Sequence, residues 1–197
     1  EMAYATIDQM AALSWATPER ATLFSAADFD ISYPVTLTSV SHAFYEHGDY
    51  PWPDATFMFV IYAADGGTIL HQSGELEAVH SANYVYDLPT PVEITGDFYV
   101  AVVPVDVSGH PSSLMRAADP GTSHSYIGSA GNWANYDDGG ENIYEFIASA
   151  FVETSAGKAK LASGEASALP TYAVKKVNKI TALSSDFIGK SALEAEI

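Results

Sequence analysis

The stretch Thr56-Phe-Met-Phe-Val-Ile-Tyr-Ala63 decides the fold class, because apolar residues occupy both of its alternating faces. A strand of this kind lies in the middle of a sheet whose two faces are both covered. The turn sequence Asp65-Gly66-Gly67 follows, and residues 68–73 are again strand-prone. A glycine-rich turn between two such runs predicts a β-hairpin.

Further strands are predicted on both sides of this hairpin, at a spacing of about ten residues. They cover 35–45, 83–88, 97–105 and 143–152, and a slip in the apolar phase indicates a bulge near Ser39. Short strands at this spacing are typical of an antiparallel β-sandwich or barrel, so we expect an all-β sandwich. The side chains expected in its core are Phe57, Phe59, Ile61, Phe98, Val100, Val102 and Phe146.

Only two stretches favour a helix. Thr6-Ile-Asp-Gln9 resembles a capping box, so the chain up to Trp15 is either a short helix or an extended lead-in to the first strand. Residues 184–196 could form a short helix broken at Gly189. The glycine-rich stretch 106–142 is predicted to be a long connection, of the kind that often carries function.

The composition excludes several classes of protein. With 197 residues and 48% hydrophobic content, the chain can bury a sizeable core. It has no cysteine, which excludes disulfides, thiolate metal sites and cysteine nucleophiles. A net charge of −17 repels phosphate backbones and anionic lipid, so we expect no nucleic-acid partner. No apolar run approaches the roughly 20 residues of a membrane span, so we expect no membrane insertion.

The charge is unevenly distributed along the chain. Residues 1–153 contain 21 acidic residues and two basic ones, whereas residues 154–197 contain six lysines and four acidic residues. The composition also becomes rich in Ala, Ser, Gly and Lys after Glu153, as in a linker. We therefore predict an acidic β-sandwich body at 1–153, a linker at 154–170 and a strand-prone, lysine-bearing tail at 171–197.

The order of several landmarks resembles a known class of module. The landmarks are Leu13-Ser-Trp-Ala16, Phe44-Tyr45, the 56–63 strand, Gly66-Gly67, Tyr84-Val-Tyr-Asp-Leu-Pro89, Pro91-Val-Glu-Ile-Thr-Gly-Asp-Phe-Tyr-Val-Ala101, Ser125-Tyr-Ile-Gly128 and Gly131-Asn-Trp133. They resemble the jelly-roll-type β-sandwich modules of secreted bacterial peptidases and surface adhesins. The resemblance implies a jelly-roll-like fold, an extracellular or cell-surface location and a non-catalytic role. The closing block 143–150 departs from the pattern, because it lacks the family's arginine.

No motif in the sequence indicates catalysis. There is no Gly-x-Ser-x-Gly elbow, and the six histidines show no i,i+4 metal-binding spacing. A serine and a histidine are adjacent in Gly121-Thr-Ser-His-Ser125, but adjacency in sequence does not make a triad. We therefore expect that the protein is not an enzyme.

Two sets of residues could bind a ligand. Asp137, Asp138 and Glu141 offer clustered oxygen ligands that suit calcium, and the alternative, which the sequence favours, is an ordinary acidic turn. The aromatic residues Tyr50, Trp52, Trp133 and Tyr136 could stack on a glycan. The alternative is that the two tryptophans close the ends of the sandwich.

The tail suggests an assembly role. Residues 171–183 are strand-prone, and they could add to an open edge of an acidic sandwich, their own or a neighbour's. The assembly residues are Tyr172, Val174, Lys175, Lys176, Val177, Lys179 and Ile180. We thus expect a non-enzymatic structural or adhesive module, such as a self-assembling filament or surface-layer subunit. The alternatives are a carbohydrate-binding module, with or without calcium, and an accessory domain of a larger secreted hydrolase.

Overall fold

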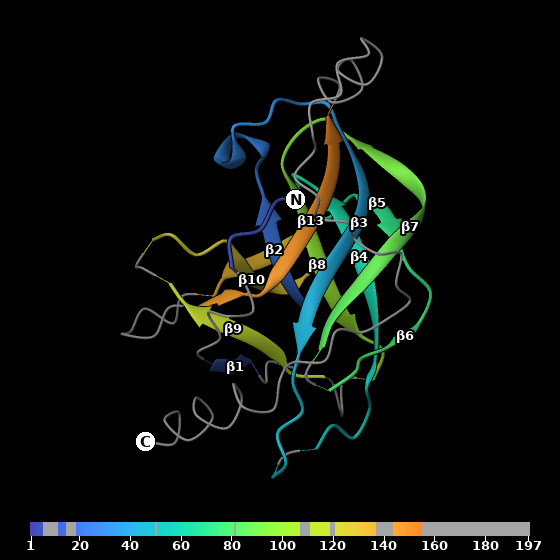
Figure 1. The fold of residues 1–197 in the computed structure, drawn as a ribbon, viewed down its shortest axis with the longest axis vertical. Helices are drawn as coiled ribbons and strands as arrows, with labels where there is room; N and C mark the ends of the chain where they lie inside the picture. Colours follow the sequence, from blue (N-terminus) through green and yellow to red (C-terminus); the bar gives the residue numbers. More distant parts are fainter. Residues whose placement is uncertain are drawn as a thin grey trace, which may run out of the picture.

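The computed structural model describes residues 1–5, 12–14, 19–49, 51–80, 82–106, 111–118, 121–136 and 144–154. This part of the chain forms two antiparallel sheets packed face to face, which confirms the predicted all-β sandwich (Figure 1). Its only helical element is the 3-10 turn Ala26–Phe29. No helix in the described ranges is long and apolar enough to cross a bilayer. The predicted helix at 184–196, the linker after residue 154 and the tail lie outside the described residues.

Sheet A has six strands, and β3 is its central strand. The strands are β1 (Ala12–Ser14), β3 (Val35–Phe44), β7 (Ala82–Ile94), β9 (Ser113–Ala117), β12 (Tyr144–Phe146) and β13 (Ala148–Thr154). Strand β3 pairs with β7 along one side and with β13 and then β9 along the other. Its pairing shifts register between Leu37 and Ser39, and the hydroxyl of Thr38 donates to the carbonyl of Phe151 at 3.0 Å. The predicted bulge near Ser39 is thereby confirmed.

Sheet B has seven strands, and the 56–63 stretch lies inside it as predicted. In spatial order they are β11 (Asn132–Asn135), β10 (Ser125–Ser129), β2 (Glu19–Phe24), β8 (Phe98–Pro104), β4 (Thr56–Ala63) and β5 (Ile69–Gln72), with β6 (Leu76–Glu77) also paired to β4. Strand β4 pairs with β8 on one side and with β5 on the other. The β4–β5 hairpin turns where Asp65 accepts hydrogen bonds from the backbone of Gly67 and Thr68, so this hairpin prediction is confirmed.

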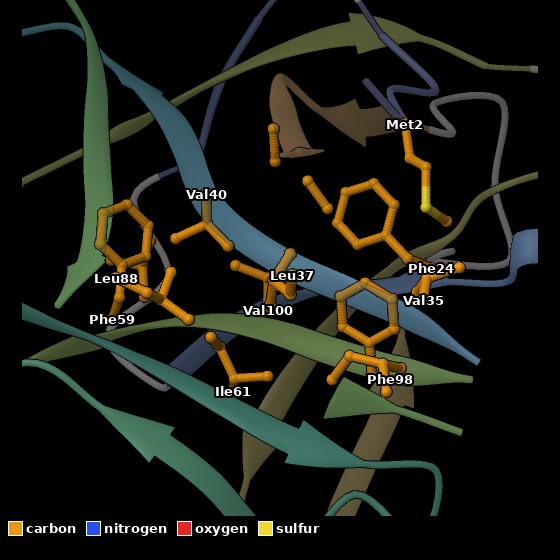
Figure 2. Packing of buried hydrophobic residues seen from close by; sticks show 14 of the residues in the cluster. Met2, Phe24, Val35, Leu37, Val40, Phe59, Ile61, Leu88, Phe98 and Val100 are labelled. Carbon is orange, nitrogen blue, oxygen red and sulfur yellow. The ribbon is translucent and has the colours of Figure 1, made fainter. Parts of the chain in front are cut away.

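The core lies between the two sheets. All seven side chains predicted to be buried are at most 3% exposed. Figure 2 shows how residues of the two sheets meet, with Leu37 and Val40 from β3 facing Ile61 and Val100 from β4 and β8. Burying a side chain of this size stabilises the fold by about 1.5–3 kcal/mol. The apolar alternation of these strands is therefore the main source of stability.

One sequence-based expectation is wrong. The stretch 106–142 is not a long connection, because β9, β10 and β11 lie within it. Strands β10 and β11 are rich in Ser, Gly and Asn, and β9 has no β-branched residue, so their pattern resembles a loop. Strand β2 was also missed, because Glu19 and Arg20 interrupt its apolar pattern. Both β2 and β10 are strands because each pairs with neighbours on two sides.

Candidate functional site

The aromatic residues predicted to bind a glycan lie in different parts of the molecule. Trp52 packs edge-on against Phe44 at a centroid distance of 6.5 Å, and its indole nitrogen donates to Ser112 at 3.0 Å. Tyr136 packs against the ring of Phe146 at 5.5 Å. Tyr50 lies outside the described residues. Trp52 and Tyr136 thus contribute to packing inside the body.

Trp133 lies instead on the outer face of sheet B. Its ring stacks on Tyr99 of β8 at 5.7 Å with an interplanar angle of 14°. Tyr62 and Tyr126 complete this outer aromatic cluster, together with small apolar side chains of the sheet. The side chain of Trp133 on β11 therefore forms part of an aromatic layer over the outer face of sheet B.

The contact between two turns holds this layer in place. The carbonyl of Gly66, in the β4–β5 turn, accepts hydrogen bonds from the Trp133 indole at 2.8 Å and from the backbone of Gly131 at 2.7 Å. Gly66 has φ of +69°, a conformation that glycine adopts without steric cost. A Cβ atom at this position would lie 2.5 Å from the Trp133 ring. The close approach explains why a glycine occupies this turn.

The predicted calcium ligands Asp137, Asp138 and Glu141 lie outside the described residues. Within the described ranges, no group of three or more acidic or histidine side chains is arranged to hold a metal ion. Calcium binding at 137–141 stays a prediction.

Two histidines lie close to serines or acids, in arrangements that the sequence did not reveal. His42 is fully buried, and its Nε2 lies 2.6 Å from the Ser113 hydroxyl, inside the sandwich. The ring of His124 lies 3.6 Å from the Asp28 carboxylate and 3.7 Å from the Glu145 carboxylate. Only the His124–Ser125 adjacency hinted at this second cluster, because its acids are distant in sequence.

Neither arrangement presents a nucleophile to solvent. Ser113 is 0% exposed beside His42. The Ser125 hydroxyl donates to the buried Glu145 carboxylate at 3.0 Å and accepts a hydrogen bond from the Phe146 backbone at 2.7 Å. Glu145 also accepts the backbone N–H of His124 at 2.7 Å. These polar groups fasten strands to one another.

Because His42 is buried, the protein is expected to lose stability in acid. Burial and the positive charge of Arg20 hold the pKa of His42 well below its usual range. In the unfolded chain this histidine takes up a proton below about pH 6.5, whereas the folded chain resists it. Stability is therefore expected to fall as the pH drops through 6.5, by at most about 1.4 kcal/mol per pH unit for this residue.

Urea unfolding between pH 7.5 and pH 5 measures this effect. His42→Gln removes the titrating group, so the variant should lose stability less steeply over this range, whatever its stability at pH 7.5. An unchanged slope would assign the acid sensitivity to other groups, such as His71, whose pKa is also lowered by burial.

A hollow of about 450 Å³ opens at one end of the body, lined by Tyr45, Glu46, His47, Gly48, Pro51 and His80. Glu46 accepts the backbone N–H of Trp52 at 2.9 Å, and His80 accepts that of Glu46 at 3.2 Å. The polar side chains that line this hollow thus hold its own loops in place.

The open edges of the sheets are the remaining candidate for function. The β13 edge is occupied, because Met2 and Ala150 exchange backbone hydrogen bonds at 2.7 and 2.9 Å. The β7 edge is interrupted by Pro89 and Pro91, which lack the N–H that strand addition needs. Strand β11 is mostly polar. Strand β5 is equally short and its pairing with β4 contains a bulge, but it carries Ile69 and Leu70, has no proline, and pairs with no described strand on its outer side.

Exposed apolar residues gather beside this open edge. Ile69 and Leu70 of β5 are 53% and 37% exposed, and Val85 of β7 is 46% exposed. The two strands are neighbours across the sandwich, because His71 and the hydroxyl of Tyr86 lie 3.1 Å apart. Figure 1 shows β5 and β7 on the same side of the body. We call the surface around Ile69 and Leu70, where β5 lies against β7, the β5–β7 side.

No family model matches this chain, and no curated protein or solved structure is significantly similar to it.

Proposed function

We propose that the protein is an extracellular or cell-surface, non-enzymatic β-sandwich module with a structural or adhesive role, which associates with copies of itself through its C-terminal tail. The observation that carries this proposal is the open β5 edge beside exposed apolar residues. Unprotected edges of this kind template strand addition, so folded proteins usually block them. An open edge in a chain that also has a strand-prone tail is consistent with self-association.

Further support comes from how the polar groups of the body are used. The two histidine clusters, at His42 and His124, fasten strands inside the fold. The resemblance of the landmarks to jelly-roll modules of secreted peptidases and adhesins supports the proposed location. Together these features favour a structural module over an enzyme.

We expect the full-length chain to form particles larger than its 21.0 kDa monomer without added ligand. Sedimentation velocity across a concentration series measures their mass, and electron microscopy shows whether they are filaments. Salt should slow association by screening lysine–carboxylate attraction, while the backbone ladder persists. A chain that remains monomeric throughout would contradict the proposal.

A carbohydrate-binding role is the second candidate function. The outer aromatic cluster supports it, because Tyr99, Tyr126 and Trp133 are only partly buried on the outer face of sheet B. Aromatic rings on a sheet face can stack on the apolar face of a sugar ring. Glycan-array binding that is lost in Tyr126→Ala, by a chain that stays monomeric, would favour this role.

A further inference from the structure

We propose that the β5 edge is the acceptor for the tail, and that residues 171–183 of a second copy add to it as a strand. The inference rests on the proposed self-association and names the surface that performs it. The occupant of the β5 edge is the tail of a neighbouring chain.

The backbone of β5 offers hydrogen-bonding groups to an added strand. Two backbone hydrogen bonds mark the ends of the β4–β5 ladder. The N–H of Ala63 donates to the carbonyl of Thr68 at 2.8 Å, and the N–H of Ser73 donates to the carbonyl of Phe59 at 2.9 Å. Antiparallel pairs alternate, so Ile69 opposite Tyr62 and Gln72 opposite Val60 occupy non-hydrogen-bonded positions. Their N–H and C=O groups therefore point away from β4.

A bulge between these two positions limits the added ladder. The register of β4 and β5 shifts between Ile61 and Tyr62, so the outward groups of β5 are three residues apart instead of two. A partner strand can satisfy both only in a short stretch and in one register. The bulge therefore makes the contact specific, and side-chain burial has to contribute much of the affinity.

The side chains of the tail suit this edge. Tyr172, Val174, Val177 and Ile180 supply apolar groups that could cover Ile69 and Leu70. Covering a partly exposed side chain of this size contributes in proportion to the apolar area removed from water. The apolar residues of the tail thus find their counterpart on the β5–β7 side.

The charges are also complementary. Asp65, Glu75 and Glu77 are exposed next to β5, and the tail carries Lys175, Lys176 and Lys179. The only basic residues of the body are Arg20, which is fully buried, and Arg116. The lysines of the tail therefore approach an edge with almost no competing positive charge.

The occupant follows from the proposed self-association. The described chain ends at Thr154 on β13, one strand away from β7 in sheet A. A tail that docked on β5 of its own chain would join no copies, so association through this edge requires the tail of a neighbouring chain.

Cysteine cross-linking of the full-length protein tests the contact directly, because the natural chain has no cysteine. Leu70→Cys chains labelled with nitrogen-15 are mixed with unlabelled Val174→Cys chains and treated with a short bismaleimide. We expect a mixed dimer, identified by mass spectrometry. Val105→Cys is the matched control, since Val105 is 40% exposed but lies outside the β5–β7 side. It should give at least tenfold less mixed dimer with Val174→Cys.

A second measurement disrupts the edge without cross-linking. Ile69→Lys/Leu70→Lys should raise the concentration at which the chain associates by tenfold or more, whereas Val105→Lys should leave it unchanged. Circular dichroism checks that each variant keeps its β-spectrum. If the double variant does not fold, the cross-linking result decides.

The outcomes separate the inference from the proposed function. A wild-type chain that never associates overturns both. A wild-type chain that associates equally well with Ile69→Lys/Leu70→Lys, and gives no mixed dimer above the control, overturns only the choice of edge. Cross-links confined within single chains of a Leu70→Cys/Val174→Cys variant show that the tail docks on its own body, which overturns the second copy as occupant.

Discussion

Replacing Arg20 by methionine is expected to raise the free energy of unfolding by about 1–4 kcal/mol. The Arg20 side chain lies inside the sandwich at 0% exposure, and none of its three guanidinium nitrogens has a hydrogen-bond partner among the described residues. Burial lowers the pKa of this arginine to about 9, because the charged form loses its hydration without an acceptor to replace it. Methionine keeps much of the apolar stem and removes the charge.

Urea unfolding at pH 7 measures the change, with Arg116→Met as a matched control. Arg116 is only half-buried, and among the described residues only its Nε is buried without a hydrogen-bond partner, so its replacement is expected to change stability less than that of Arg20. Arg20→Lys keeps the buried charge and should give no gain. A loss of stability in Arg20→Met would contradict the prediction and would indicate an anionic partner from outside the described residues.

Gly66→Ala is expected to have the largest destabilising effect among the surface turns, at about 3 kcal/mol. The positive φ of this residue costs an alanine about 1 kcal/mol. The added methyl group would also lie 2.5 Å from the Trp133 ring, so the tryptophan must move. That movement breaks the two hydrogen bonds to the Gly66 carbonyl, worth about 1 kcal/mol each.

The unfolding midpoint and the tryptophan fluorescence of the folded state report this change together. Gly96→Ala is the matched control, because a Cβ there meets nothing within 4 Å and its φ is not in the left-handed region. In a Trp133→Ala background, Gly66→Ala should cost only its backbone part, about 1 kcal/mol. Equal costs in both backgrounds would show that the two turns are not coupled.

The sequence predicts those strands in which apolar residues form a clear local pattern. Strands β4 and β8 carry aromatic and β-branched residues on both faces, and the phase slip at Ser39 marks a real bulge in β3. Strands β9 and β10 do not show this signal, because Ser113 and Ser125 are buried through hydrogen bonds and not through apolar character. Their burial depends on partners such as His42 and Glu145, which no local pattern can indicate.

The open β5 edge could not be predicted from the sequence for a related reason. Whether a strand is central or at an edge depends on which strands pair with it, and this is a property of the whole fold. The run 69–72 reads as an ordinary hairpin strand, so nothing local distinguishes it from a covered one. Trp52 and Trp133 look equivalent in sequence, yet one packs against the core and the other stacks on the outer face of sheet B.

The bridge between Met2 and Ala150 also governs how the body would respond to mechanical tension. The pairing is antiparallel, so the chain before Met2 points along β13 in the direction of Thr154. If the protein is pulled by its first residue and by Thr154, both forces therefore act near the same end of β13. Such a load peels Met2 from β13 against two backbone hydrogen bonds, instead of shearing the whole strand at once. Peeling would expose the edge of β13 at Ala150 and at the same time pull the buried Met2 side chain out of the core.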